Sequence, residues 1–318
     1  MLNLTKDTNL EEPFYINEPF PILVYDNFLS KKECDELIQE ASNIAKKDNY
    51  EVMGGRFVIP WRSTIFKGLI SKSRIWKSIK EKMPEEAFRI FNKISENNTK
   101  KETYFKKWKN RKRFYFVDDI YSLSKYILSK KLYKSYRKRL DMPSRMIPNN
   151  ALILYGLLGI LDNIYRKLRS IYDLIIGKVP LIPLFEYNAS FKGYAREVHR
   201  DTDSRVFVCI LYLNELRDDN ISNSGGSLEI YEKIKNKDFY APQPINNDVK
   251  KIINIEPKPG RFVFFFNQSN SYHAVNKMSF FKKGRHFIYG GFSLQSSLGS
   301  AAKFKSKGNL PTNYLIYR

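Results

Sequence analysis

Eight short runs of β-forming residues follow one another from about Val179 onward, and this pattern limits the possible folds more than any other feature of the chain. The runs are LIPLFEYN, GYAREVHRD, RVFVCILYLNE, GSLEIYE, KIINIE, GRFVFFFNQ, SYHAVNK and RHFIYGGFSL. Turn residues separate them, including Gly225-Gly226 and the segment from Pro257 to Gly260. Short strands at this spacing are typical of antiparallel barrels and jelly rolls. The sequence therefore predicts a β core over residues 181–298.

A strand followed by a helix is expected near the N-terminus. The run FPILVYDNF is rich in β-forming residues, and Ser30 and Glu33 after it have the spacing of a helix capping box. We assign residues 1–70 to an N-terminal strand–helix part of the main domain.

Residues 71–180 change to a helical pattern without a strong strand, and apolar residues at 3.6-residue spacing continue to Ile175, before Gly177 and Pro180. We assign this range to a helical insertion that is basic and aromatic-rich, and residues 299–318 to a C-terminal tail. The predicted class is α+β.

The charge of the chain is strongly positive, with 55 Lys and Arg against 33 Asp and Glu, a net charge of +22. Such a field attracts anionic partners. Basic and aromatic residues are densest between residues 100 and 145, which suits an acidic macromolecule such as nucleic acid, or an anionic lipid or glycan surface. The alternative is a solvated cationic face of the insertion.

The location expected from the sequence is cytoplasmic, with peripheral attachment to a membrane as an alternative. The first residues lack the apolar core of a secretory signal, and no apolar run is long enough to cross a bilayer. The two cysteines are too few for a disulfide framework or a thiolate zinc site. The oligomeric state is left open.

The stretch REVHRDTDSR can be interpreted as a kinase catalytic loop or as part of a metal site. A kinase loop requires Asn five residues after the Asp, but Val206 stands there, and neither a glycine-rich phosphate loop nor D-F-G is present. On a strand, however, His199 and Asp201 would point to the same side. With His273 from a later strand they form the two-histidine, one-carboxylate set that suits non-haem Fe(II). Arg285 could bind the far carboxylate of a chelating cosubstrate.

These segments, from Leu184 to Leu294, resemble the double-stranded β-helix (jelly roll) of the 2-oxoglutarate- and Fe(II)-dependent oxygenases, nearest the prolyl-hydroxylase-like branch. The resemblance runs in order through GYAREVHRD, RVFVCILYLNE, GGSLEIYE, EPKPGRFVFFFNQSNSYHAV and GRHFIYGGFSL. The opening ILVYDNFLSKKECDELI resembles the strand–helix start of that branch. Together these segments cover about half of the chain and leave the range from about Ile70 to Ile182 unmatched.

The resemblance implies a role for each matching residue. His199, Asp201 and His273 would bind Fe(II), and Arg285 would bind the distal carboxylate of the cosubstrate 2-oxoglutarate. Tyr212 would donate a hydrogen bond to that carboxylate, and Tyr187 is a candidate for lining the cosubstrate pocket. The substrate-binding candidates, for which a structural role is the alternative, are Arg205 and Arg62. O2 is the second cosubstrate, and ascorbate is a candidate auxiliary reductant.

The reaction implied is that of a dioxygenase, in which oxidative decarboxylation of 2-oxoglutarate is coupled to hydroxylation of a C–H bond. A prolyl or other side chain of a protein or peptide is the first substrate class, and a glycan the second. Gly291 stands where nucleic-acid repair relatives carry a second arginine, which disfavours nucleobase demethylation. The alternative function is a non-catalytic cationic module that binds nucleic acid or an anionic membrane or glycan surface.

Overall fold

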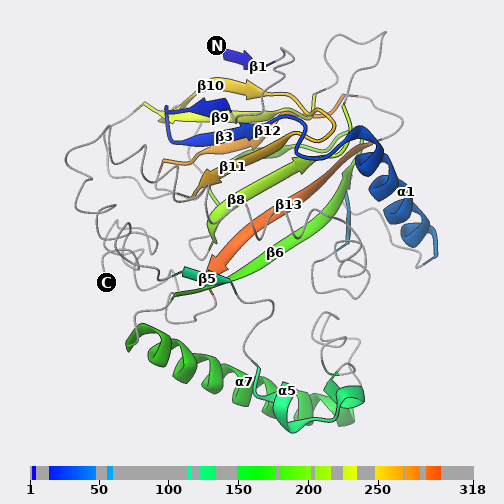
Figure 1. Ribbon diagram of the computed structural model, residues 1–318, viewed down its shortest axis with the longest axis vertical. Helices are drawn as coiled ribbons and strands as arrows, with labels where there is room; N and C mark the ends of the chain where they lie inside the picture. Colours follow the sequence, from blue (N-terminus) through cyan, green and yellow to red (C-terminus); the bar gives the residue numbers. More distant parts are fainter. Residues whose placement is uncertain are drawn as a thin grey trace.

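Figure 1 shows the computed structural model of the protein. The described residues are 2–4, 14–47, 56–59, 114–116, 122–133, 136, 149–175, 179–201, 205–215, 225–234, 248–267, 270–279 and 284–294. Arg62, the tail 299–318 and most of the basic segment 100–145 lie outside these ranges.

The described strands form two sheets, and α-helices are few, as expected for the α+β class. The five-stranded sheet has the order β1 (Leu2–Leu4), β10 (Val249–Ile255), β9 (Leu228–Lys233), β12 (His273–Val275), β7 (Arg196–His199). The eight-stranded sheet has the order β2 (Phe14–Ile16), β3 (Ile22–Tyr25), β11 (Phe262–Phe266), β8 (Arg205–Tyr212), β13 (Arg285–Leu294), β6 (Val179–Ser190), β4 (Arg56–Ile59), with β5 (Phe114–Phe116) paired to β6.

The eight predicted β runs correspond one to one to β6 through β13, so this part of the prediction is confirmed. The pairings recorded among these eight strands are antiparallel. One buried apolar cluster contains side chains of both sheets, such as Ile230 and Ile253 from one and Val208, Ile210 and Phe265 from the other. The core that supports the site therefore lies between the two sheets.

The strand–helix start is also confirmed. β3 pairs with β11, and α1 (Lys31–Lys47) begins directly after Ser30. The capping box is formed in both directions, since the amide of Glu33 donates to Oγ of Ser30 (3.2 Å) and the amide of Ser30 donates to Oε2 of Glu33 (2.9 Å). β2, β3 and β4 of the N-terminal part thus belong to the larger sheet, whereas β1 belongs to the smaller one.

Among the described residues of the predicted insertion are the helices α5 (Ser124–Ile127) and α7 (Asn149–Ile175), and residues 130–133 are also helical. The range was predicted to contain no strong strand, and the structure adds one short strand, β5 (Phe114–Phe116), which pairs in parallel with the start of β6. Three residues are too short for an alternating pattern to reveal a strand, and only its neighbour in space defines it. Among the described residues, no helix is both long enough and apolar enough to cross a membrane.

Gly290 and Gly291 allow β13 to lie between its two neighbours. A Cβ at Gly290 would be 1.9 Å from the carbonyl oxygen of Leu184, and a Cβ at Gly291 would be 1.8 Å from that of Phe207. Their φ angles of 155° and 152° are also in a range that favours glycine. The close approach of β13 to β8 therefore explains why residue 291 is a glycine.

Candidate metal centre

Two neighbouring strands of the smaller sheet bring the two predicted metal-binding histidines together. β7 ends at His199, which lies directly opposite His273 at the start of β12. Their ring centroids are 4.4 Å apart. Asp201 follows two residues after His199, and one ligand atom from each of the three lies within 4.8 Å of the others. All three residues are buried, so the structure forms one compact donor set.

Backbone carbonyls orient both imidazole rings. Nδ1 of His199 lies 2.8 Å from the carbonyl oxygen of Glu197, and Nδ1 of His273 lies 3.0 Å from that of Ser271. Because a carbonyl oxygen can only accept, each Nδ1 carries the proton in these bonds. Nε2 of each ring is then the unprotonated nitrogen, which is the form that binds a metal.

The surroundings also favour the protonation states that a cation needs. Burial, with the nearby His273 adding to it, lowers the pKa of His199 to about 4. Burial likewise lowers the pKa of His273. For Asp201, burial alone would raise the pKa, but Arg205, His273 and the hydrogen bond from Tyr289 together hold it below its ordinary value. At neutral pH the site thus offers two neutral imidazoles and one carboxylate.

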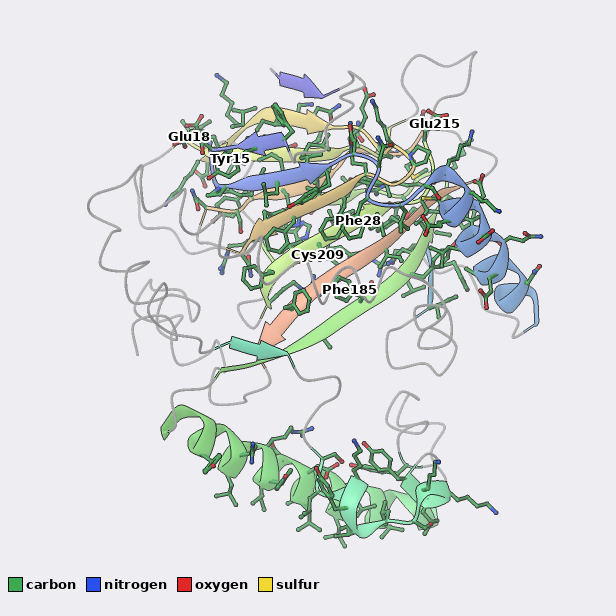
Figure 2. The ribbon with its side chains drawn as sticks, viewed as in Figure 1. Tyr15, Glu18, Phe28, Phe185, Cys209 and Glu215 are labelled. Atoms are coloured by element: carbon green, nitrogen blue, oxygen red, sulfur yellow. The ribbon has the colours of Figure 1, made fainter. Side chains whose placement is uncertain are left out.

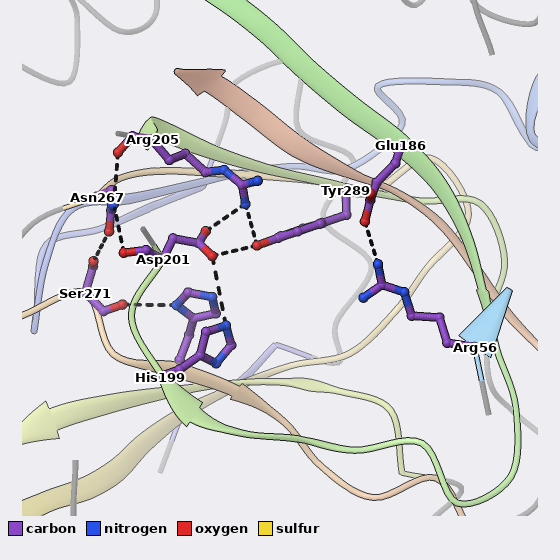
Figure 3. Close-up of polar contacts among 9 residues, drawn as sticks. Arg56, Glu186, His199, Asp201, Arg205, Asn267, Ser271 and Tyr289 are labelled. Atoms are coloured by element: carbon purple, nitrogen blue, oxygen red, sulfur yellow. Dashed lines mark hydrogen bonds and ion pairs between the residues drawn. The ribbon is translucent and has the colours of Figure 1, made fainter. Parts of the chain in front are cut away.

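Both carboxylate oxygens of Asp201 accept hydrogen bonds from the larger sheet (Figure 3). The hydroxyl of Tyr289 donates to Oδ1 at 2.6 Å, and Nη1 of Arg205 donates to Oδ2 at 3.1 Å. The same Nη1 also donates to the Tyr289 oxygen at 2.5 Å. The three side chains form a closed ring that determines the orientation of the carboxylate.

The side chain of Asn267 forms hydrogen bonds to several segments of the chain around the site (Figure 3). Its amide nitrogen donates to the carbonyl oxygens of Arg205 (2.9 Å) and Asp201 (3.4 Å). Its amide oxygen accepts from the hydroxyl of Ser271 (3.1 Å). Since Ser271 also accepts from His273, one buried amide links the segments that carry Asp201 and His273.

Arg285 is 1% exposed, at the start of β13, with its guanidinium beside Tyr212. Nη2 donates to the Tyr212 hydroxyl at 3.3 Å, whereas Nε and Nη1 have no hydrogen-bond partner. Ser190, directly opposite on β6, also has a buried hydroxyl without a partner. Buried donors of this kind are costly unless a ligand accepts from them. The unpaired donors of Arg285 and Ser190 could bind the carboxylate of a small anionic cosubstrate.

The structure does not bring Tyr187 to this pocket. Tyr187 lies opposite Ile288, one step out of phase with the pair Arg285 and Ser190, so it points to the other face of the sheet. There its hydroxyl contacts Nδ1 of His286 at 2.6 Å. His286 thus packs inside the protein and is not part of the metal centre.

Of the two substrate-binding candidates, Arg205 and Arg62, the structure describes only Arg205. Arg205 is half-buried and lies against Asp201 and Tyr289, close to the donor set. Arg62 lies outside the described residues.

Sequence reasoning missed Tyr289 and Asn267. Tyr289 could have been found from the two-residue period of β13, which places it on the same face as Arg285. On that face Tyr289 lies opposite Glu186, which forms an ion pair with Arg56 at 2.6 Å (Figure 3). Asn267 follows β11, and no local pattern in the sequence distinguishes it from an ordinary turn residue.

Comparison with known proteins gives one family match. Residues 185–290 match the family model described as the 2OG-Fe(II) oxygenase superfamily. The matched segment contains the three residues of the donor set and Arg285. A search of curated protein sequences finds no match to the chain.

Several solved structures are similar to the chain at low identity. A prolyl hydroxylase from Trichoplax adhaerens, solved in complex with a peptide fragment of the hypoxia inducible factor oxygen degradation domain, is 13% identical with a TM-score of 0.38, covering 86% of this chain and 83% of its own. A prolyl-4-hydroxylase from Pseudomonas putida is 13% identical with a TM-score of 0.32, covering 86% and 91%. A prolyl 4-hydroxylase from Phytophthora capsici is 11% identical with a TM-score of 0.36, covering 92% and 70%.

Proposed function

We propose that the chain, whose residues 185–290 match the family model of the 2OG-Fe(II) oxygenase superfamily, hydroxylates a C–H bond of a prolyl or other side chain in a protein or peptide, or of a glycan. An enzyme of this superfamily uses Fe(II), 2-oxoglutarate and O2. His199, Asp201 and His273 would bind the iron. Arg285 and Tyr212 would bind 2-oxoglutarate.

The single observation that carries the proposal is the convergence of the donor set and the buried guanidinium in one core. Two imidazoles and one carboxylate are the ligands that non-haem Fe(II) accepts while positions stay open for a chelating cosubstrate and O2. Nε and Nη1 of Arg285, buried without partners, fit an incoming carboxylate. A protein that only binds a polyanion would need neither arrangement.

Each group of the protein then has a defined task. The backbone carbonyls that accept from Nδ1 keep the Nε2 lone pairs of His199 and His273 available. Tyr289 and Arg205 hold the carboxylate of Asp201 in one orientation. Arg285 would anchor one end of 2-oxoglutarate, so that the other end is presented to the metal. Bound iron would supply the oxidising chemistry that converts 2-oxoglutarate, O2 and a C–H bond into succinate, CO2 and an alcohol.

We further propose that the two sheets are the double-stranded β-helix of this superfamily, spanning residues 181–298. Residues 1–70 would complete that domain, and residues 71–180 would be the basic insertion. The antiparallel pairings from β6 to β13 and the pairing of β3 with β11 support this division.

The test is succinate production by the full chain loaded with Fe(II) and supplied with 2-oxoglutarate, O2, and pools of proline-containing peptides or glycans. His199→Ala should abolish turnover. His286→Ala is the matched control, because both histidines are buried to the same extent, 8% exposed, and only His199 belongs to the donor set. Substrate-dependent succinate that persists in His199→Ala would contradict the assignment of the iron site.

The same experiment separates the enzyme from the cationic binding module. If the chain yields no succinate with any pool although it binds Fe(II), the oxygenase proposal fails. Binding of an acidic polymer that is equal in the original chain and in His199→Ala would then favour the module.

A further inference from the structure

The exposed apolar side chains of the described residues gather on the two helices α5 and α7 and on the short helical segment 130–133 that follows α5. Outside these helical segments, Ile234 is the one large hydrophobic residue among those described that is comparably exposed, at 58%. The members of the group, each 41–73% exposed, are Tyr126, Ile127, Leu132, Leu154, Leu157, Ile160, Leu161, Ile164, Leu168 and Tyr172. A patch of this extent on a folded protein generally marks a contact surface.

Most of these side chains form one stripe along α7. The spacing from Leu154 through Leu161 and Leu168 to Tyr172 keeps them within roughly a third of the helix circumference. The stripe is about 27 Å long at 1.5 Å per residue. In Figures 1 and 2, α7 lies apart from the two sheets, and many of its side chains project on the side that faces away from them.

Polar contacts lie on a different face of α7. Asp162 is 3% exposed and accepts hydrogen bonds from the amide of Ser124 (2.8 Å) and the hydroxyls of Ser122 (2.9 Å) and Tyr136 (3.2 Å). These contacts attach α7 to the segment around α5. The stripe therefore lies on a face of α7 other than the one that packs on α5, and its side chains are exposed.

The charge around the stripe is positive. Lys125, Lys130, Lys131 and Lys167 are exposed. Among the side chains described in residues 122–133 and 149–175, the one carboxylate is that of Asp162, which is buried. The chain as a whole carries +22. A second copy of the chain would bring lysines against lysines, whereas an anionic surface would complement them.

We propose that α7, with α5 beside it, docks in the plane of an anionic lipid bilayer. The apolar stripe would enter the boundary between headgroups and acyl chains, and the four lysines would contact anionic headgroups. Tyr126 and Tyr172 are amphipathic rings of the kind enriched at that boundary. This surface is separate from the metal centre, so the proposal does not depend on the oxygenase assignment.

The test is co-sedimentation of the full chain with phosphatidylcholine vesicles that contain roughly one-third phosphatidylserine. The double substitution Ile160→Glu with Ile164→Glu should lower the bound fraction by at least about tenfold, because two apolar side chains can no longer enter the bilayer. Ile234→Glu is the matched control, since Ile160 and Ile234 are both 58% exposed. It should bind as the original chain does.

Two further measurements complete the test. Binding should weaken when salt is raised to about 0.15 M or when phosphatidylserine is omitted. Hydrogen exchange of residues 149–175 should slow on vesicles. The proposal is overturned if the double variant binds vesicles as well as the original chain does, or if vesicles without phosphatidylserine bind the chain equally well. It is also overturned if the original chain does not bind vesicles and light scattering shows that it is a dimer which the substitutions dissociate.

Discussion

The hydroxyl of Tyr289 donates a 2.6 Å hydrogen bond to Oδ1 of Asp201, the same oxygen that lies 4.0 Å from Nε2 of His199. A residue on the larger sheet thus orients a carboxylate that the smaller sheet presents beside its histidines. Such contacts determine how well a ligand residue holds a metal, because they keep its donor atom in place before the ion arrives.

Replacing Tyr289 by Phe should weaken metal binding roughly tenfold, within the 10- to 100-fold range typical of residues that orient a ligand. The expected measurement is titration with Co(II) followed by visible absorption, which needs no turnover. Tyr187→Phe is the matched control, because it removes a hydroxyl from the opposite face of the same sheet, where the partner is His286. An equal loss of affinity in both variants would assign the effect to the stability of the sheet.

Arg285→Gln should weaken 2-oxoglutarate binding roughly 10- to 100-fold, because one hydrogen bond to a charged group contributes about 1.5–3 kcal/mol. Arg285→Lys should not restore full affinity, since an ammonium cannot form the paired hydrogen bonds of a guanidinium. Calorimetric titration of 2-oxoglutarate into the metal-loaded protein measures both effects. His286→Gln, next along β13 and facing the other way, should leave the affinity unchanged, and a loss there would count against the assignment.

Metal binding near pH 7 should release few protons from the donor set. The pKa of His199 is lowered to about 4 and that of His273 is also lowered, so both rings are already neutral at pH 7. Affinity should therefore change little between pH 7 and 8 and fall as the pH approaches the pKa of His199. Calorimetry in two buffers of different ionisation enthalpy counts the protons, and release of nearly two at pH 7 would contradict the lowered values.

The same lowered values affect the stability of the metal-free protein. The unfolded chain binds protons at an ordinary histidine pKa near 6.5, whereas the folded chain resists them until about pH 4. The stability that depends on His199 is thus present above pH 6.5 and is lost as the pH falls toward 4.

Cys34 and Cys209 should react slowly with thiol reagents in the folded protein. Burial raises the pKa of the Cys34 thiol to about 12, and it also raises that of Cys209. Because the thiolate is the reactive form, labelling at pH 8 should follow the opening of the structure in denaturant. Fast labelling of either cysteine without denaturant would show that its segment opens more easily than its burial implies.

The order of the strands could be read directly from the sequence, because turn residues interrupt the runs of β-forming residues. The spacing of His199 and Asp201, with His273 and Arg285 on later strands, predicted which side chains could converge. The capping box at Ser30 and Glu33 was equally local. The strand runs, the spacing of His199 and Asp201 and the capping box each depend on residues within a few positions of one another, so a one-dimensional pattern contains them.

Register and the contacts between the sheets were decided only in the tertiary structure. Tyr187, which contacts His286, and Ser190, which lies opposite Arg285, are three residues apart on β6 and therefore point to opposite faces, and no local pattern sets that phase relative to β13. Tyr289 and Asn267 are distant in sequence from Asp201 and contact it only because the two sheets share one core. Likewise, the periodicity of α7 marked an apolar face, but only the structure shows that this face is exposed and that the face with the buried Asp162 packs on α5. Such relations depend on long-range packing, which a one-dimensional pattern does not encode.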